Sequence, residues 1–144
     1  MNNKARGGKS SELMVASLLT RNSIDVYFPI VDDIAIDMII RTESIYYDIQ
    51  VKSVKNYNRI VGVKELHSKN KNYIIIIHYR HDKKNDEFFY LTLKQAKDQW
   101  KEKNKNGDIN KWGDLIFNKE HREKFSTQNL EDLASKILLG KLKT

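Results

Sequence analysis

The chain has 144 residues, a formal net charge of +7 and no cysteine, which excludes a disulfide scaffold, Cys-ligated zinc or iron–sulfur sites and a cysteine nucleophile. Its hydrophobic fraction of 40% is enough to fill the core of one domain over residues 1–144, and no apolar run approaches the roughly 18–20 residues that a membrane span needs. We therefore expect an intracellular protein whose excess of basic residues favours a polyanionic partner.

The first elements expected along the chain are an arm and a helix. Residues 1–8 are basic and polar with no apolar segment behind them, so we expect a flexible arm and no signal peptide. A helix is predicted over 9–21, and Ser10 or Ser11 can cap it.

The middle of the chain is predicted to be rich in strands. They are expected, in chain order, at 26–28, 33–42, 45–53, 72–80, 87–93 and 112–117. The range 72–80 is a continuous apolar run, which is typical of a central buried strand. Helices are predicted at 94–103 and within 127–141, where apolar residues recur at helical spacing before Gly140. This order predicts an α/β or α+β domain built around one sheet.

Most of the excess positive charge lies in residues 52–71. This stretch has six Lys or Arg residues and one acid, so it carries +5 of the total. Ammonium groups together with nearby Asn amides are donors that bind phosphates. The alternative is a solvated loop that binds nothing.

An acidic residue marks the predicted first helix. Glu12 lies three, four and seven residues before Val15, Ala16 and Leu19, so the four share one face, and that face is apolar. A carboxylate on a core-facing stripe is costly to desolvate unless it has a partner. The alternative places Glu12 at the edge of this face, in the first turn, where an acid suits the helix dipole.

A second acid, Asp37, lies in the isoleucine-rich range 33–42. Three apolar residues flank it on each side. Asp has low strand propensity and a high burial cost there, so it needs a metal, a basic residue or several hydrogen-bond donors. We favour a functional role for Asp37.

Strand pairing would bring further polar residues to Asp37. A hairpin that turns at residues 43–44 places Asp37 opposite Gln50 and near Lys52. Gln50 and Lys52 share one face of an alternating strand, and that face could simply be exposed to solvent. If Glu12 approaches from a packed helix, however, acid, amide and ammonium groups gather in one place.

Such a cluster suits Mg²⁺, which takes oxygen ligands and usually only one or two protein carboxylates. Asp37 and Glu12 can supply the carboxylates, and the Gln50 side chain or the Val51 backbone carbonyl can add a neutral oxygen. Lys52 beside the metal could lower the pKa of an attacking water, position it, or neutralise charge that builds up on a phosphate.

These residues resemble the PD-(D/E)xK nuclease superfamily, in its small Holliday-junction-resolvase-like and homing-endonuclease-like branch. The matching text is GGKSSELMVASLLTRNSIDVYFPIVDDIAIDMII followed by YYDIQVKS. The resemblance implies catalytic residues Glu12, Asp37, Gln50 and Lys52. It also implies a restriction-endonuclease-like α-β-β-β-α-β core, in which helices flank a central mixed sheet.

One residue departs from the family pattern. Gln50 stands where the family usually has an acid, which removes one negative charge from the metal site. Some active members of this branch tolerate Gln there, so we expect activity. The C-terminal half carries no motif that matches the family.

The resemblance implies a metal-dependent DNA endonuclease that uses Mg²⁺, with Mn²⁺ as a substitute, on duplex or branched DNA. Two target strands favour a homodimer or a higher homo-oligomer by symmetry. The residues expected to contact DNA are Lys9, Ser10, Ser53, Lys55, Asn56, Tyr57, Arg59, Lys64, Lys69 and Lys71. The alternatives are a DNA-binding module of the same fold without catalysis, and a structural protein that binds no nucleic acid.

The four histidines are not expected to form a metal site, because they are scattered along the chain. His78 ends the apolar run 72–80, so we expect it to lie at the edge of the core with its polar atoms bonded.

Overall fold

The structure is a computed structural model that describes residues 3–30, 35–55, 59–63, 71–103 and 113–144. The described elements are α1 (Asn3–Arg21), β1 (Val26–Tyr27), β2 (Met38–Arg41), β3 (Tyr46–Val54), β4 (Arg59–Val63), β5 (Tyr73–Tyr79), β6 (Glu87–Thr92), α2 (Leu93–Lys103), β7 (Gly113–Phe117), α3 (Lys119–Lys124) and α4 (Leu130–Leu138). None of these helices is long and apolar enough to cross a membrane.

The central sheet has five strands in the order β1-β2-β3-β5-β6. It is mixed, because β3 and β5 are parallel while the other neighbours are antiparallel. In the β2–β3 hairpin, Met38 pairs with Ile49 and Ile39 with Asp48, which is the register predicted from the turn at 43–44. Strands β4 and β7 form a separate antiparallel pair.

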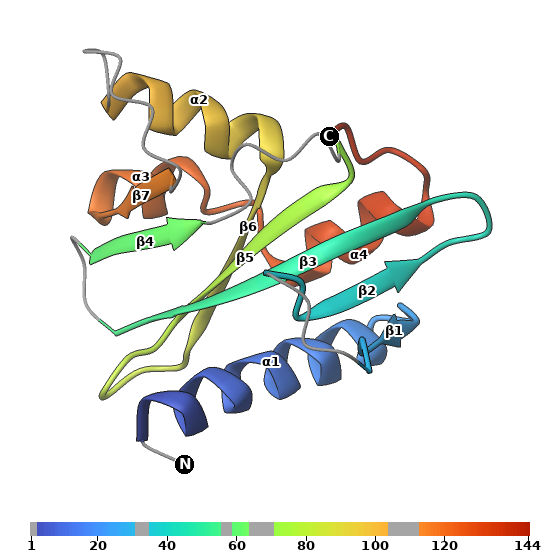
Figure 1. Ribbon diagram of the computed structural model, residues 1–144, viewed down its shortest axis with the longest axis horizontal. Coiled ribbons are helices and arrows are strands. Elements are labelled where there is room, and N and C mark those ends of the chain that lie inside the picture. Colours follow the sequence, from blue (N-terminus) through green and yellow to red (C-terminus); the bar gives the residue numbers. More distant parts are fainter. Residues whose placement is uncertain (1–2, 31–34, 56–58, 64–70, 104–112) are drawn as a thin grey trace.

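The sheet separates two apolar clusters, and each is covered by different elements (Figure 1). On one face, α1 and α4 pack against the hairpin strands and against Ile74 and Ile76 of β5. On the other face, α2 and β7 pack against Ile75 and Ile77. All four isoleucines have 0% exposure, so β5 is buried on both faces as its unbroken apolar sequence predicts.

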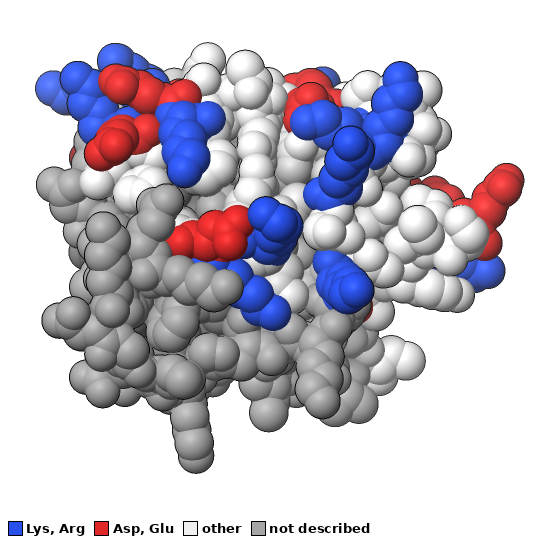
Figure 2. Space-filling view, turned by 90° about the horizontal axis from the view of Figure 1, so that it is seen from above, with Lys and Arg blue, Asp and Glu red and all other residues white. Residues whose placement is uncertain are grey.

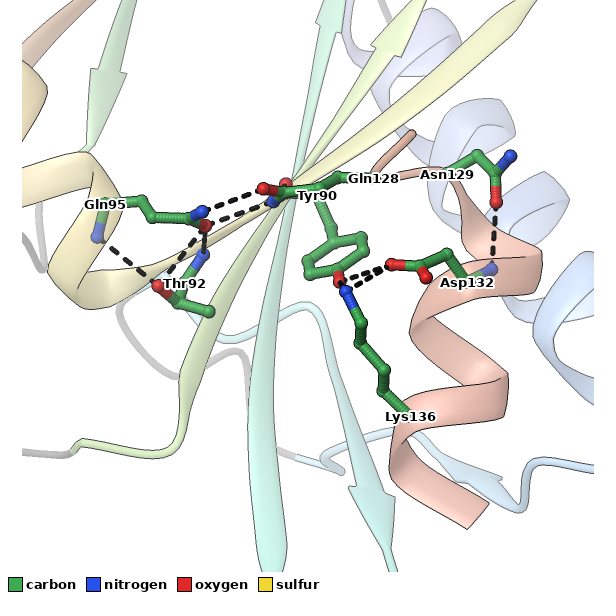
Figure 3. Close-up of polar contacts among 7 residues, drawn as sticks. All are labelled: Tyr90, Thr92, Gln95, Gln128, Asn129, Asp132 and Lys136. Atoms are coloured by element: carbon green, nitrogen blue, oxygen red, sulfur yellow. Dashed lines mark hydrogen bonds and ion pairs between the residues drawn. The ribbon is translucent and has the colours of Figure 1, made fainter. Parts of the chain in front are cut away.

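A polar network attaches α4 to the sheet (Figure 3). The Tyr90 hydroxyl of β6 donates to Asp132 Oδ2 at 2.6 Å and accepts from Lys136 Nζ at 3.1 Å. Lys136 and Asp132 also form an ion pair at 2.8 Å. Burial raises the pKa of Tyr90, so its hydroxyl keeps the proton that it donates.

The start of α1 differs from the prediction. We expected the helix to begin at Lys9 after a flexible arm, but it begins at Asn3, so residues 3–8 are helical. Gly7 and Gly8 have poor helix propensity, which favours a later start. A Cβ on Gly7 would come within 3.3 Å of the Arg80 guanidinium, so glycine allows the helix and Arg80 to approach closely here.

The strand around Asp37 is also shorter than predicted. The range 33–42 reduces to β2 at Met38–Arg41, and residues 31–34 lie outside the described residues. Ala35 has φ of 65°, which takes the chain out of the extended conformation two residues before Asp37. Asp37 therefore precedes β2 and does not lie within it.

Two elements were not predicted. Strand β4 lies inside the basic stretch 52–71, so the solvated-loop alternative is wrong for that part. Helix α3 is only 6 residues long and has no buried residue, so it carries no apolar periodicity. Its start is fixed by a capping box between Asn118 and His121.

Candidate functional site

Asp37 binds strand β3 with both its backbone and its side chain. Its amide donates to the Ile49 carbonyl at 2.9 Å. Its Oδ2 accepts from the Val51 amide at 2.6 Å. The carboxylate thus takes the place of the next backbone acceptor, just before β2 begins, and it is held against the central strand β3.

The surroundings of Asp37 include three of the charged residues considered above. Burial raises the pKa of Asp37, although the hydrogen bond from the Val51 amide lowers it. The negative charge of Glu12 raises this pKa further, and the positive charges of Lys52 and Lys9 lower it. Glu12 and Lys52, predicted from separate elements, therefore lie within electrostatic reach of Asp37.

Glu12 lies at the edge of the buried face of α1. Val15, Ala16 and Leu19 on this face are buried in the core, as predicted. The Glu12 side chain keeps 19% exposure, and its Oε2 accepts from Lys9 Nζ at 2.7 Å. The carboxylate is thus partly desolvated and has a basic partner. It lies at the edge of the apolar face as the alternative proposed, but the placement in the first turn is wrong, because α1 begins at Asn3.

Gln50 is buried in the sheet, with 3% exposure. The possibility that this face of β3 is exposed to solvent is therefore wrong at Gln50. Its Oε1 is buried and has no hydrogen-bond partner among the described residues. Leaving such an acceptor unpaired costs roughly 1–3 kcal/mol, so the position favours a bound group that Oε1 can contact.

Val51 and Lys52 complete the cluster on β3. The Val51 amide points toward Asp37, and the amide and carbonyl of one strand residue point to the same side. We therefore expect the Val51 carbonyl to face the same side, beyond the start of β2. Lys52 is half-buried and shares a strand face with Gln50.

The oxygen atoms of this cluster fit a hard divalent cation. Asp37 and Glu12 offer carboxylates, Gln50 offers the unpaired Oε1, and sulfur and imidazole are absent from the set. No group of three or more His, Cys, Asp or Glu residues that could hold a metal occurs among the described residues. In this cluster only Asp37 and Glu12 are acids, because Gln50 stands where the pattern described above usually has a third acid.

The residues predicted to contact DNA are only partly described. Asn56, Tyr57, Lys64 and Lys69 lie outside the described residues, and Arg59 is the first residue of β4. Lys9 and Ser10 are exposed on α1, and Lys71 is exposed just before β5.

Two further members of this set lie at the end of β3. Lys55 Nζ pairs with Asp82 Oδ1 at 3.1 Å, and both side chains are more than half exposed, at 55% and 69%. Ser53 Oγ is buried and has no hydrogen-bond partner in the described part of the chain. Figure 2 shows one face on which most Asp and Glu side chains lie beside a Lys or Arg, so the described charges there are mixed.

A buried polar chain next to the cluster was not predicted as a unit. His78 Nδ1 lies 2.8 Å from Ser11 Oγ, and His78 Nε2 lies 2.7 Å from Asp86 Oδ2. His78 is at the core edge with both ring nitrogens bonded, as expected. The burial of Ser11 could have been predicted, because Ser11 shares the buried face of α1 with Val15. Asp86 lies in a predicted turn, where no sequence pattern indicates a buried partner.

A groove of about 720 Å³ lies elsewhere, between the β2–β3 turn and the C-terminal end of α4. None of the residues predicted to be catalytic lines it.

Comparison with known proteins supports the fold. No protein-family model and no curated protein matches the sequence. Among solved structures, the Holliday junction resolvase Hjc of Archaeoglobus fulgidus matches with a TM-score of 0.56 and 10% identity, over 88% of this chain and 99% of that chain. A bacterial homing endonuclease, I-Ssp6803I, matches with a TM-score of 0.47 and 13% identity, over 64% of this chain and 70% of that chain. The restriction-endonuclease-like α+β fold is thereby confirmed.

Proposed function

We propose that this chain is a metal-dependent endodeoxyribonuclease that hydrolyses phosphodiester bonds in duplex or branched DNA. The observation that carries the proposal is the buried, unpaired Gln50 Oε1 on β3, one residue before Val51, whose amide donates to the Asp37 carboxylate. Glu12 and Lys52 lie within electrostatic reach of the same carboxylate. The fold shared with a Holliday junction resolvase agrees with DNA as the substrate.

Mg²⁺, or Mn²⁺ in its place, would be held by Asp37, Glu12, Gln50 Oε1 and the Val51 carbonyl. The bound ion would supply Lewis-acid stabilisation of the phosphate and a water of lowered pKa. The pKa of Asp37 is raised because burial outweighs the Val51 hydrogen bond and the positive charges of Lys52 and Lys9. A cation there would stabilise the ionised form, which is the form that binds metal.

Lys52 would act on the substrate itself. Its ammonium group, on the same face as Gln50, would position the attacking water and offset the negative charge that develops on the phosphate. Lys9, Ser10, Ser53, Lys55 and the basic residues up to Lys71 would contact the DNA backbone on either side of the scissile phosphate. We expect a homodimer or higher homo-oligomer when two strands are cut.

Cleavage assays on linear, supercoiled and branched DNA, each with Mg²⁺, with Mn²⁺ and with EDTA, test this function. We expect products only with metal and a loss of at least about 100-fold in Asp37→Ala and Lys52→Ala. Asp98→Ala and Lys94→Ala are matched controls, because these residues form an exposed ion pair on α2. Wild-type cleavage rates in both site variants would refute the site assignment.

A second function, DNA binding without cleavage, is favoured by one observation. Gln50 leaves two acids in the cluster, and fewer carboxylates weaken metal binding. This alternative predicts salt-dependent DNA binding that EDTA does not change, together with no product in either metal.

A further inference from the structure

The chain formed by Ser11, His78 and Asp86 lies directly beside the proposed metal ligand Glu12. Ser11 and His78 each have 2% exposure, and the His78 ring stacks on Phe88 at 4.5 Å between centroids with planes 10° apart. Asp86 is fixed in turn, because its Oδ1 accepts from the His81 amide at 3.2 Å. Every polar atom of the His78 ring therefore has a partner, and the ring is held in one orientation.

These three side chains have the order of a hydrolytic triad, but they are not placed for that chemistry. The Ser11 hydroxyl lies within α1 and is almost fully buried, so no substrate carbonyl can reach it. It also lies 3.0 Å from the Gly7 carbonyl, to which it can donate. The chain of hydrogen bonds therefore has a structural role.

The protonation of Asp86 and His78 decides which hydrogen bonds Ser11 can form. Hydrogen bonds from His78 and from the His81 amide keep the pKa of Asp86 below its usual value despite burial, so Asp86 is ionised and accepts from His78 Nε2. Burial lowers the pKa of His78, although Asp86 opposes this, and the nearby Arg80 lowers it further. In the neutral ring Nδ1 is then an acceptor for Ser11. The single hydroxyl hydrogen of Ser11 can then be donated to His78 Nδ1 or to the Gly7 carbonyl, and both acceptors lie within 3.0 Å of Oγ.

The N-terminal half of α1 needs such an anchor. Gly7 and Gly8 each weaken the helix by about 1 kcal/mol relative to Ala. The apolar anchors of the helix, Val15 and Leu19, both lie after Glu12. Ser11 lies one residue before Glu12 and ties the helix to β5, so Glu12 is fixed from both sides.

We propose that Ser11, His78 and Asp86 are positioning residues that set the rotation of α1 and thereby hold the Glu12 carboxylate at the metal site beside Asp37. This inference rests on the proposed function for the role of Glu12 as a ligand. It concerns metal binding and not the cleavage step, so the two can fail separately.

Isothermal titration calorimetry with Mn²⁺ on the full chain tests the proposal. We expect Ser11→Ala to weaken Mn²⁺ binding about tenfold or more, as loss of a supporting hydrogen bond does at other metal sites. Ser17→Ala is the matched control, because Ser17 is exposed on the same helix. His78→Asn keeps an amide near the Nδ1 position and should bind Mn²⁺ more tightly than His78→Leu.

A double-mutant cycle separates positioning from general stability. If Ser11 acts through Glu12, Ser11→Ala should not weaken Mn²⁺ binding further in a Glu12→Gln background. A Ser11→Ala protein with a lower Tm but wild-type Mn²⁺ affinity would overturn the proposal, as would an additive loss in the double variant. Absence of Mn²⁺ binding by the wild type would also overturn it. Mn²⁺ binding without DNA cleavage would instead contradict the proposed function alone.

Discussion

At the scale of single residues, the surroundings of Asp37 disfavour the ionised form of its side chain. Burial and the negative charge of Glu12 both raise its pKa, while the Val51 amide, Lys52 and Lys9 lower it by less. The ionised side chain is thus less stable in the folded chain than in the unfolded one. Such a raised pKa is typical of functional sites and does not stabilise the fold.

Replacing Asp37 with Asn should therefore raise the thermal stability of the metal-free protein while it removes cleavage. Asn keeps an oxygen that can accept from the Val51 amide, but it places no charge in the buried position. Differential scanning calorimetry in EDTA measures the Tm, and a cleavage assay measures activity. A lower Tm than wild type would contradict the account of the buried charge.

Gln50→Glu should make the protein depend more strongly on metal. The new carboxylate would be buried beside Asp37, so the Tm in EDTA should fall, whereas saturating Mg²⁺ should raise the Tm by more than in wild type. Asn129→Asp is the control, because it adds a carboxylate at a helix N-cap where Asp caps as well as Asn. Equal Mg²⁺ responses in wild type and Gln50→Glu would argue against Gln50 as a ligand.

The site residues could be predicted from sequence wherever a polar residue breaks an apolar pattern. Asp37 and Glu12 stand out in this way, and the turn at 43–44 fixed the partner of Asp37. The burial of Gln50 could not be predicted, because its strand alternates as a solvent-facing strand does. The link from Ser11 to His78 joins residues 67 positions apart and depends on how α1 packs on the sheet.

At the scale of elements, α4 is attached by an apolar face and by the Tyr90 network. Leu130, Leu133, Ala134 and Ile137 are buried on the sheet, and Asp132 and Lys136 hold the Tyr90 hydroxyl beside them (Figure 3). Because α4 shares its apolar cluster with α1, its packing also supports the helix that carries Glu12.

Leu133→Ala should lower the free energy of unfolding by about 2–5 kcal/mol, since Leu133 has 0% exposure and the smaller side chain leaves a cavity. Leu138→Ala makes the same change on the same helix at a position with 60% exposure, and we expect a change within about 0.5 kcal/mol. Urea denaturation measures both variants. Similar values for the two would mean that α4 does not pack as described.

The apolar run 72–80 and the short strands β1 and β7 were predicted closely, whereas β4 and α3 were not predicted and α1 was given too late a start. The run 72–80 became β5 because seven consecutive buried residues leave few alternatives to a central strand. Strand β4 has five residues and pairs with β7, which is distant in sequence. Helix α3 has six residues and no buried one, so only its capping box marks it in the sequence.

At the scale of the whole molecule, several acidic residues of the described chain, among them Glu87 and Asp132, are tied to basic or histidine partners. Hydrogen bonds from Arg122 and His81 hold the pKa of Glu87 below its usual value, although burial alone would raise it. The pKa of Asp132 is lowered in the same direction by Lys136 and Tyr90, again against burial. Glu87 thereby links β6 to α3, and Asp132 links β6 to α4.

These lowered pKa values predict acid sensitivity. A carboxylate with a lowered folded-state pKa stabilises the fold fully above its unfolded pKa of about 4, and this stability is lost as the pH falls through the lower folded value. We expect the urea midpoint to fall as the pH drops from about 5 to 2. Glu87→Gln should show a smaller fall, because Gln does not titrate. Parallel curves for the two proteins would contradict the contribution of Glu87.

The measurement that tests the central claim most directly is anomalous diffraction from crystals of the chain soaked with Mn²⁺. The account predicts one manganese peak bonded to the Asp37 carboxylate and Gln50 Oε1, at about 2.0–2.3 Å from each oxygen, with Glu12 alongside. The same peak should be missing from Asp37→Asn crystals. A peak at another group of residues, or none in crystals of protein that cleaves DNA with Mn²⁺, would contradict the assignment of this cluster as the metal site.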